Sequence, residues 1–303
     1  MANLCNIDGQ ITSEEDARIP VLDRGFLFGD SIYEVVRTHR GVPLAWPEHW
    51  TRLKASAAAL GMELDQSEAT IAHRCAKTMV QAAHGDCYVR IIVTRGTGEA
   101  PNIDVAYASN PPRWIILVRP LQLASGAAVK LALVDRLRND RRALDPATKS
   151  GNYLNNVMGL AEAKASGATD CVMLNGDGSV TEASTSNLFA RIDGVWCTPP
   201  LAAGILVGIT RSMLLTFLPE AGEKAEERHI SKEELLRAEE IFLSSTLRDI
   251  GPVTHLNGRR LHPANPQAVG GPSTQLLIPG FRDYLARRLA KHDTPHWQKL
   301  LSE

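Results

Sequence analysis

Apolar and polar positions alternate with two different periods in the first 120 residues, and they predict a mixture of strands and helices. Strands are predicted where β-branched residues alternate with polar ones, at 4–11 with a turn at Asp8-Gly9, and at 31–39, 86–94 and 113–120. Helices are predicted over 47–60, where Pro47 falls in the first turn and Gly61 ends the helix, and over 67–83. The segment 21–30, interrupted by glycines, predicts an ordered loop.

The rest of the chain repeats this mixture. We predict strands over 129–134, 170–174 and 240–243, a hairpin over 189–198, and helices after 152, from 208, over 231–237 and over 280–291. The helix over 231–237 opens with Ser-x-x-Glu, which is typical of a capping box. A crossover of small and polar residues at 122–127 places a domain boundary near residue 120, which predicts domains 1–120 and 121–303.

Composition excludes several classes of partner. The formal net charge is −1, and no basic run interleaved with aromatic residues supports binding to nucleic acid. No run approaches the roughly 20 apolar residues of a membrane span, and the first ten residues lack a signal-peptide pattern. The five cysteines lack CxxC spacing, which predicts a reducing, cytoplasmic setting. The nine histidines show no metal-ligand spacing, so we expect no metal.

The stretch 145–189 carries the strongest chemical signal, and Lys149 is its centre. Lys149 precedes a helical run, and the helix dipole disfavours a cation at this position. A lysine placed there against this effect indicates a chemical role for its amine. A solvated surface lysine is the alternative. Farther along, a tight turn at Asn175-Gly176-Asp177-Gly178 leads into a strand with Glu182, followed by the polar residues of 184–187.

Several motifs in order resemble one family. They are Lys149 with Asn152-Tyr153-Leu154, the run 180–189 (VTEASTSNLF) and the run 204–211 (GILVGITR). Together, within about 9–253, they resemble the class IV aminotransferases, pyridoxal-phosphate enzymes of fold type IV. The resemblance implies an α/β (α+β) fold with a smaller N-terminal domain, a larger C-terminal cofactor-binding domain and the cofactor in the interdomain cleft. It also implies a homodimer, in which loops of a second subunit complete the active site.

The resemblance also assigns roles. Lys149 would bind the aldehyde of pyridoxal 5'-phosphate and move a proton during the reaction. Glu182 would bind the pyridine nitrogen. Arg52, in the pattern Glu48-His49-x-x-Arg52-Leu53, would bind the phosphate. Five further residues complete the expected cofactor site: Tyr153 near the ring oxygen, Leu206 against the ring, and Ile209, Thr210 and Thr246 on the phosphate.

Arg90 is the residue most informative about the substrate. An arginine inside an apolar strand is unfavourable unless it meets an anion, so it forms either a structural ion pair or a trap for a substrate carboxylate. The spacing Tyr88-x-Arg90 resembles the branched-chain enzymes. The other expected substrate residues are Phe28, Tyr33, Arg37 and Arg248; Tyr33 and Arg37 share one face of the strand over 31–39, and Glu34 lies on the other.

The subfamily features form a mosaic. D-amino-acid aminotransferases carry an R-x-H motif after T-R-G-T, whereas here the residues 94–97 are followed by GEAPN. We therefore expect ping-pong transamination between a branched-chain or other aliphatic L- or D-amino acid and a 2-oxo acid. The alternatives are an (R)-selective amine transaminase, an aminodeoxychorismate lyase, and a binding protein that holds the cofactor without turnover.

Overall fold

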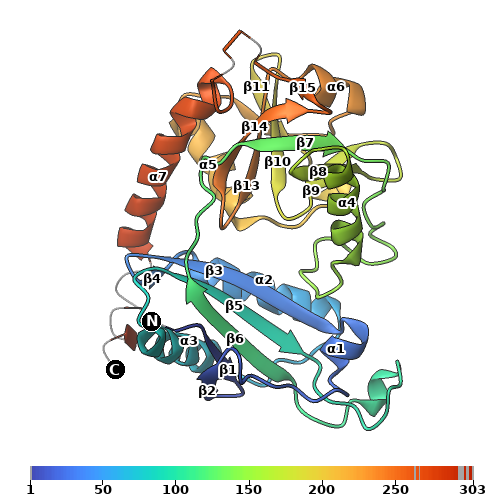
Figure 1. Cartoon of the computed structure of the whole chain (residues 1–303), viewed down its shortest axis with the longest axis vertical. Coiled ribbons are helices and arrows are strands. Elements are labelled where there is room, and N and C mark those ends of the chain that lie inside the picture. Colours follow the sequence, from blue (N-terminus) through green and yellow to red (C-terminus); the bar gives the residue numbers. More distant parts are fainter. Residues whose placement is uncertain (1, 263, 266, 293–296, 298–299, 302–303) are drawn as a thin grey trace. The chain divides into compact units, whose positions relative to one another are not determined.

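The computed structural model describes the chain except for residues 1, 263, 266, 293–296, 298–299, 302 and 303. The chain divides into two compact units (Figure 1). Unit 1 comprises Met1–Gln122, Thr148–Asn152 and Arg287–Glu303, and unit 2 comprises Leu123–Ala147 and Tyr153–Ala286. The segment with Lys149 thus belongs to the unit formed mainly by the first 122 residues.

Unit 1 contains an antiparallel six-stranded sheet with the order β2-β1-β6-β5-β3-β4. Its strands are β1 (Leu4–Ile7), β2 (Gln10–Ser13), β3 (Ser31–His39), β4 (Val42–Pro43), β5 (Cys87–Thr94) and β6 (Arg113–Pro120). Its helices are α1 (Arg24–Phe28), α2 (Trp46–Ala59), α3 (Glu68–Ala82) and the 3-10 turn η1 (Val105–Tyr107).

The register of this sheet shows that α2 and α3 cover the same face. Asn6, Ile116, Ile91 and Glu34 are successive partners across β1, β6, β5 and β3, so their side chains share one face. Asn6 donates to Thr78 of α3, and Glu34 contacts two residues of α2. On the opposite face, Tyr88, Arg90 and Ile92 of β5 are half-buried, and Thr94 at the end of the strand is buried.

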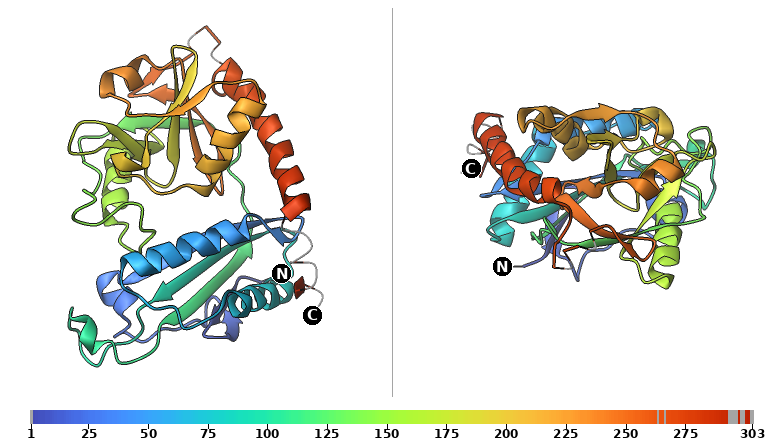
Figure 2. Two further views of the ribbon diagram at one scale, coloured as in Figure 1. Left: turned by 180° about the vertical axis from the view of Figure 1, so that it is seen from behind. Right: turned by 90° about the horizontal axis from the view of Figure 1, so that it is seen from above.

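Unit 2 is built on a nine-stranded mixed sheet, shown from two further directions in Figure 2. The order is β12-β11-β10-β13-β14-β7-β8-β9, with β15 paired to β14; β11–β12, β14–β7 and β7–β8 are the parallel pairs. The strands are β7 (Val129–Leu133), β8 (Asp170–Leu174), β9 (Val180–Ala183), β10 (Asn187–Ile192), β11 (Val195–Thr198), β12 (Ala225–Glu227), β13 (Glu240–Ser245), β14 (Asp249–Leu256) and β15 (Arg259–Arg260).

The helices of this part of the chain are α4 (Leu154–Ala165), α5 (Ile209–Glu220), α6 (Lys232–Arg237), α7 (Pro272–His292) and the 3-10 turn η2 (Leu201–Ala203). The main core of unit 2 is formed by apolar residues of the sheet, including Val172, Leu188 and Leu243. Gly159 of α4 allows this helix to approach β8 closely, since a Cβ there would lie 3.3 Å from the sulfur atoms of Cys171 and Met173.

Most predicted elements are present, and two differ. The predicted loop over 21–30 contains α1, a helix of five residues that is capped by the Asp23 side chain and ends at Gly29 in the left-handed region. Such a short helix has no apolar period to reveal it. The last helix begins at Pro272 instead of position 280. It continues through Pro279, although a proline inside a helix removes one backbone hydrogen bond. The capping box of α6 is confirmed.

Candidate active site

The Lys149 segment runs alongside β3 as a short additional strand. The backbone N–H of Tyr33 donates to the Lys149 carbonyl at 3.0 Å, and the N–H of Gly151 donates to the Ser31 carbonyl at 2.8 Å. The segment approaches β3 closely at Gly151, where a Cβ would lie 2.2 Å from the Ser31 hydroxyl oxygen and 3.3 Å from the Gly29 carbonyl oxygen. Pairing of this segment with β3 therefore fixes where the lysine side chain begins.

The Lys149 side chain lies against Tyr33, together with a second cation. Its Nζ is 4.3 Å from the centre of the Tyr33 ring, and Cζ of Arg90 is 4.0 Å from the same centre. Val35 and Arg90 are register partners, so Arg90 shares a sheet face with Tyr33 and with Arg37. Among the described residues, the buried Nε of Arg90 has no hydrogen-bond partner. This donor is suited to an anion next to Lys149.

Arg52 forms a bidentate ion pair on the helix-covered face of the same sheet. Its Nε and Nη2 donate to the two carboxylate oxygens of Glu34, both at 2.7 Å, and His49 Nδ1 also lies 2.7 Å from Glu34. Ser56, on the same helix, accepts a hydrogen bond from the Lys149 backbone N–H at 3.1 Å. Glu34, His49 and Ser56 were not among the predicted site residues.

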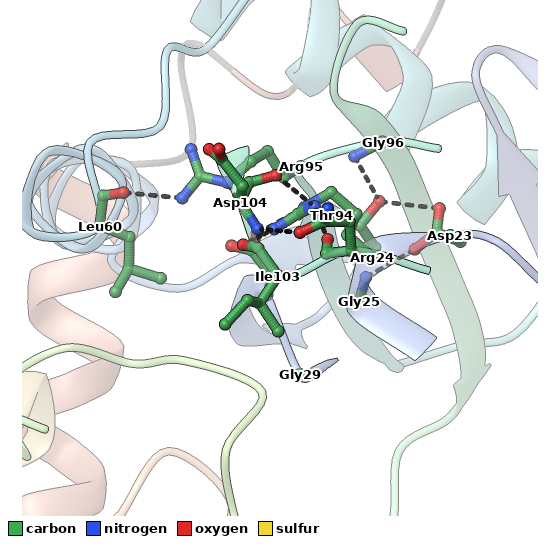
Figure 3. A network of polar contacts seen from close by, with 12 residues as sticks. Asp23, Arg24, Gly25, Gly29, Leu60, Thr94, Arg95, Gly96, Ile103 and Asp104 are labelled. Carbon is green, nitrogen blue, oxygen red and sulfur yellow. Dashed lines mark hydrogen bonds and ion pairs between the residues drawn. The ribbon is translucent and has the colours of Figure 1, made fainter. Parts of the chain in front are cut away.

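A second arginine network fixes the segment that follows Thr94-Arg95-Gly96-Thr97 (Figure 3). Arg24 donates to three consecutive carbonyls, those of Asn102, Ile103 and Asp104, at 2.7–3.1 Å. Arg24 and Arg95 share one oxygen of Asp30, at 3.0 and 2.8 Å. Arg95 also donates to the carbonyls of Leu60 and Gly61, just past the end of α2. These arginines therefore hold the loop after β5 and the end of α2.

In unit 2, Glu182 is a buried carboxylate with its orientation fixed by three residues. Arg138 donates to Oε1 through Nε at 3.2 Å and Nη2 at 3.0 Å. Asn187 Nδ2 and the Leu206 backbone N–H donate to Oε2 at 3.1 and 3.0 Å. The predicted residues Glu182 and Leu206 are thus in direct contact. Arg138 was not among the predicted site residues, because no spacing linked it to Glu182.

Asn187 connects Glu182 with the start of α5, where Ile209 and Thr210 lie. A Cβ on Gly208 would lie 1.8 Å from Asn187 Oδ1, so only glycine fits immediately before this helix. Backbone N–H groups at a helix start favour an anion. On the neighbouring strand, Ser244 is the register partner of Asn187, and its buried hydroxyl oxygen has no partner among the described residues.

Four predicted residues lie elsewhere in their units. Thr246 is half-buried in the turn after β13, a turn closed by the hydrogen bond from the Arg248 N–H to the Ser245 carbonyl. Arg248 pairs with the buried Asp170 at 3.3 Å. Tyr153 is half-buried at the N-cap of α4.

Phe28 ends α1 in unit 1, and Cζ of Arg24 is 5.2 Å from its ring centre. The structure therefore brings together Lys149, Tyr33 and Arg90 in unit 1, and Glu182 and Leu206 in unit 2.

The described residues contain neither a cluster suited to a metal ion nor a membrane-spanning helix. No group of three or more histidine, cysteine, aspartate or glutamate side chains there is arranged to hold a metal ion. None of the helices in that part of the chain combines the length and the apolar content needed to cross a bilayer.

Comparison with known proteins identifies relatives over nearly the whole chain. The family model for amino-transferase class IV matches residues 31–256. A D-alanine aminotransferase from Bacillus licheniformis is 32% identical over 292 residues, which cover 94% of this chain and 98% of that protein. Among solved structures, a branched-chain aminotransferase from Thermoproteus uzoniensis has a TM-score of 0.85 and 27% identity, covering 95% of this chain and 96% of the other. The branched-chain amino acid aminotransferase of Escherichia coli has a TM-score of 0.82 and 26% identity, covering 91% and 92%.

Proposed function

The chain belongs to the class IV aminotransferases and is an enzyme that transfers amino groups between amino acids and 2-oxo acids, and we propose that Lys149 and Glu182 are its central cofactor residues. Enzymes of this class use pyridoxal 5'-phosphate. The family and fold type IV predicted from the motifs are confirmed. The observation that carries the site assignment is that both side chains are already oriented, Lys149 by β3 and Tyr33, and Glu182 by Arg138, Asn187 and Leu206.

The residues present fit this cofactor. It needs an amine for its aldehyde, an anion for its pyridine nitrogen and donors for its phosphate. Lys149 and Glu182 are the amine and the anion. The backbone N–H groups at the start of α5 and the buried hydroxyl group of Ser244 offer donors. We assign the phosphate to Arg52, Ile209, Thr210 and Thr246, and the ring to Tyr153 and Leu206.

When bound, the cofactor supplies a carbonyl that takes up the amino group and a ring that accepts electron density from the substrate Cα. Lys149 attaches the cofactor and then carries a proton to and from Cα. Glu182, as a carboxylate, keeps a proton on the pyridine nitrogen. The ping-pong scheme returns Lys149 to its starting state after each pair of half-reactions.

We propose that Arg90 binds the substrate carboxylate, with Arg37 and Arg248 as further carboxylate partners, and that Phe28 and Tyr33 contact the substrate. The support is the position of Arg90 on the Tyr33 ring, next to Lys149, and its buried Nε. Arg90→Ala should raise KM for amino acids about 10- to 100-fold, as expected for loss of one charge-assisted hydrogen bond, and should change KM for simple amines much less. Equal effects on both donor types would remove Arg90 from this role.

The preferred donor can be tested by absorbance of the cofactor without an amino acceptor. L-Leucine, D-alanine and (R)-1-phenylethylamine are added separately to the purified protein. Loss of the band of the lysine-bound cofactor with L-leucine would support a branched-chain enzyme, and loss with D-alanine would support a D-amino-acid enzyme that uses Arg37 and Arg90 in place of the missing R-x-H. A response to the amine alone would contradict a carboxylate-dependent site.

The remaining alternatives make distinct predictions. An aminodeoxychorismate lyase would release pyruvate without an amino acceptor. A binding protein would keep its band unchanged with every donor. The relatives named as D-alanine and branched-chain aminotransferases favour the transaminase over both.

We propose that the enzyme is a homodimer. Four large apolar side chains lie exposed on and beside α4, with exposed fractions of 69% for Leu154, 57% for Val157, 43% for Met158 and 54% for Leu137. A cluster of this kind favours a protein interface. Sedimentation should give a dimer, and a monomer active at nanomolar concentration would contradict the proposal.

We also propose a cytoplasmic location. The support is that the five cysteines are all buried and free, as expected of a protein that folds in a reducing compartment.

A further inference from the structure

A buried network of one acid, one histidine and one arginine joins β3 to α2. Glu34 is 1% exposed, and it contacts Arg52 with both oxygens and His49 with one. His49, Arg52 and Ser56 are spaced three and four residues apart on α2, so they form one stripe of this helix. The whole stripe faces Glu34 or the Lys149 backbone.

The electrostatics of the network favour one charge state. Burial opposes ionisation of Glu34, but the charge and hydrogen bonds of Arg52 and those of His49 outweigh it and hold the pKa of Glu34 at about 2. Burial lowers the pKa of His49 more than Glu34 raises it, and the charges of Arg52 and Lys149 lower it further. At neutral pH the network therefore consists of an anionic Glu34, a cationic Arg52 and a neutral His49 that donates its Nδ1–H to Glu34.

The contact between Glu34 and Arg52 restricts the arginine more than a single hydrogen bond would. Two parallel N–H to oxygen bonds define the plane of the guanidinium, as well as its position. A free arginine side chain samples many rotamers, and a ligand would otherwise have to remove this freedom on binding. Glu34 removes it in advance, and it does so from the strand whose neighbouring residue, Tyr33, holds Lys149.

We propose that Glu34, braced by His49, is the positioning residue for phosphate recognition by Arg52. The inference rests on the proposed function, because it takes Arg52 as a phosphate ligand. Glu34 acts only through Arg52, so its effect is confined to ligands that carry the phosphate. A purely structural ion pair would affect all ligands of the site alike, whatever it contributes to the stability of the fold.

The test compares two ligands of the cofactor-free full chain, pyridoxal 5'-phosphate and pyridoxal, which lacks the phosphate. Dissociation constants are measured from the absorbance of the lysine-bound form. Glu34→Gln keeps the size of the side chain and removes its charge. It should weaken binding of pyridoxal 5'-phosphate about 10- to 100-fold, as expected when a charged hydrogen-bonded pair is disrupted, and should leave pyridoxal within about twofold. The double variant Glu34→Gln/Arg52→Gln should bind no more weakly than Arg52→Gln alone.

A matched control is available on the same helix. Glu48 also pairs with an arginine, Arg288, but does not contact the Glu34 network, so Glu48→Gln should leave both dissociation constants unchanged. If Glu34→Gln does not fold, His49→Gln removes the brace alone and should produce a smaller loss that is still selective for the phosphate.

Three results would contradict the role proposed for Glu34. An equal loss for both ligands, or no loss for either, would overturn the role of Glu34 while leaving the aminotransferase assignment intact. Failure of the unaltered protein to bind pyridoxal 5'-phosphate at all would overturn the proposed function together with this inference. Additive losses in the double variant would show that Glu34 does not act through Arg52.

Discussion

Each unit contains one buried pair of a glutamate and an arginine, and the two pairs use the same contact for opposite purposes. In unit 1, Arg52 contacts Glu34 at 2.7 Å; in unit 2, Arg138 contacts Glu182 at 3.0 Å. All four side chains are at most 10% exposed. In our account the arginine of the first pair binds the cofactor phosphate, whereas in the second pair it is the glutamate that binds the pyridine nitrogen.

The difference shows that one kind of ion pair can offer either a cation or an anion to a ligand. A buried ion is unfavourable unless it is paired and hydrogen-bonded, so a site that needs a cation requires an anion behind it, and the reverse. Glu34 has that supporting position in unit 1, and Arg138 has it in unit 2. Removal of the charge from one member of a pair should therefore have different consequences in the two units.

The largest effect is expected from removal of the charge of Glu182. Glu182→Gln should lower kcat about 10²- to 10³-fold, because a neutral amide cannot hold a proton on the pyridine nitrogen. The measurement is steady-state kinetics with a saturating amino donor. Glu162→Gln is the control, since Glu162 is partly exposed and lies 3.9 Å from Arg136. An unchanged kcat for Glu182→Gln would mean that another group binds the nitrogen.

A large effect on stability is expected from Arg138→Met. Arg138→Met removes the guanidinium that pairs with the buried carboxylate of Glu182, which should lower the free energy of unfolding by about 3–5 kcal/mol. Urea denaturation of the cofactor-free protein measures it. The double variant Arg138→Met/Glu182→Gln should regain part of this loss, because the uncompensated charge is absent. A double variant less stable than Arg138→Met would contradict the pairing.

A pH-dependent effect of similar origin is expected for Glu34. Its pKa is lowered from 4.5 to about 2, so its contribution is fully present above pH 4.5 and is lost as pH falls towards 2. The contribution is on the order of 3 kcal/mol. Unfolding free energies measured from pH 2 to 6 should therefore fall less steeply with acid in Glu34→Gln than in the unaltered protein. Parallel curves for the two proteins would contradict this assignment.

The smallest effect is expected for the exposed pair formed by Glu48 of α2 and Arg288 of α7. Glu48 and Arg288 are 39% and 24% exposed, so solvent screens their attraction. Glu48→Gln should change the free energy of unfolding by less than about 1 kcal/mol. Urea denaturation at neutral pH is sufficient, and a loss comparable to that of Arg138→Met would show that burial is not what distinguishes the pairs.

The sequence predicted the ligand-facing member of each pair and missed its support. Arg52 and Glu182 fall in spaced motifs, so the resemblance to a family assigns them. Glu34 is 18 positions from Arg52, and Arg138 is 44 positions from Glu182. Such contacts depend on how strands and helices pack, and periodicity does not report this.

In the fold, too, features set by neighbouring residues were predicted, and contacts between distant parts of the chain were not. The alternation that predicted β3 also separated Tyr33 from Glu34 correctly, because that pattern is local. The pairing of the Lys149 segment with β3 joins positions more than a hundred residues apart, and nothing in the sequence indicated it. The beginning of α7, before position 280, and the short helix α1 were not predicted, for the local reasons given above.

The central claim is that Lys149 is the residue that carries the cofactor. Borohydride reduction of the protein loaded with pyridoxal 5'-phosphate makes the attachment permanent, and peptide mass spectrometry then locates it. We expect a single modified lysine, at position 149. Stoichiometric modification of a different lysine, such as Lys54 on α2, would contradict it.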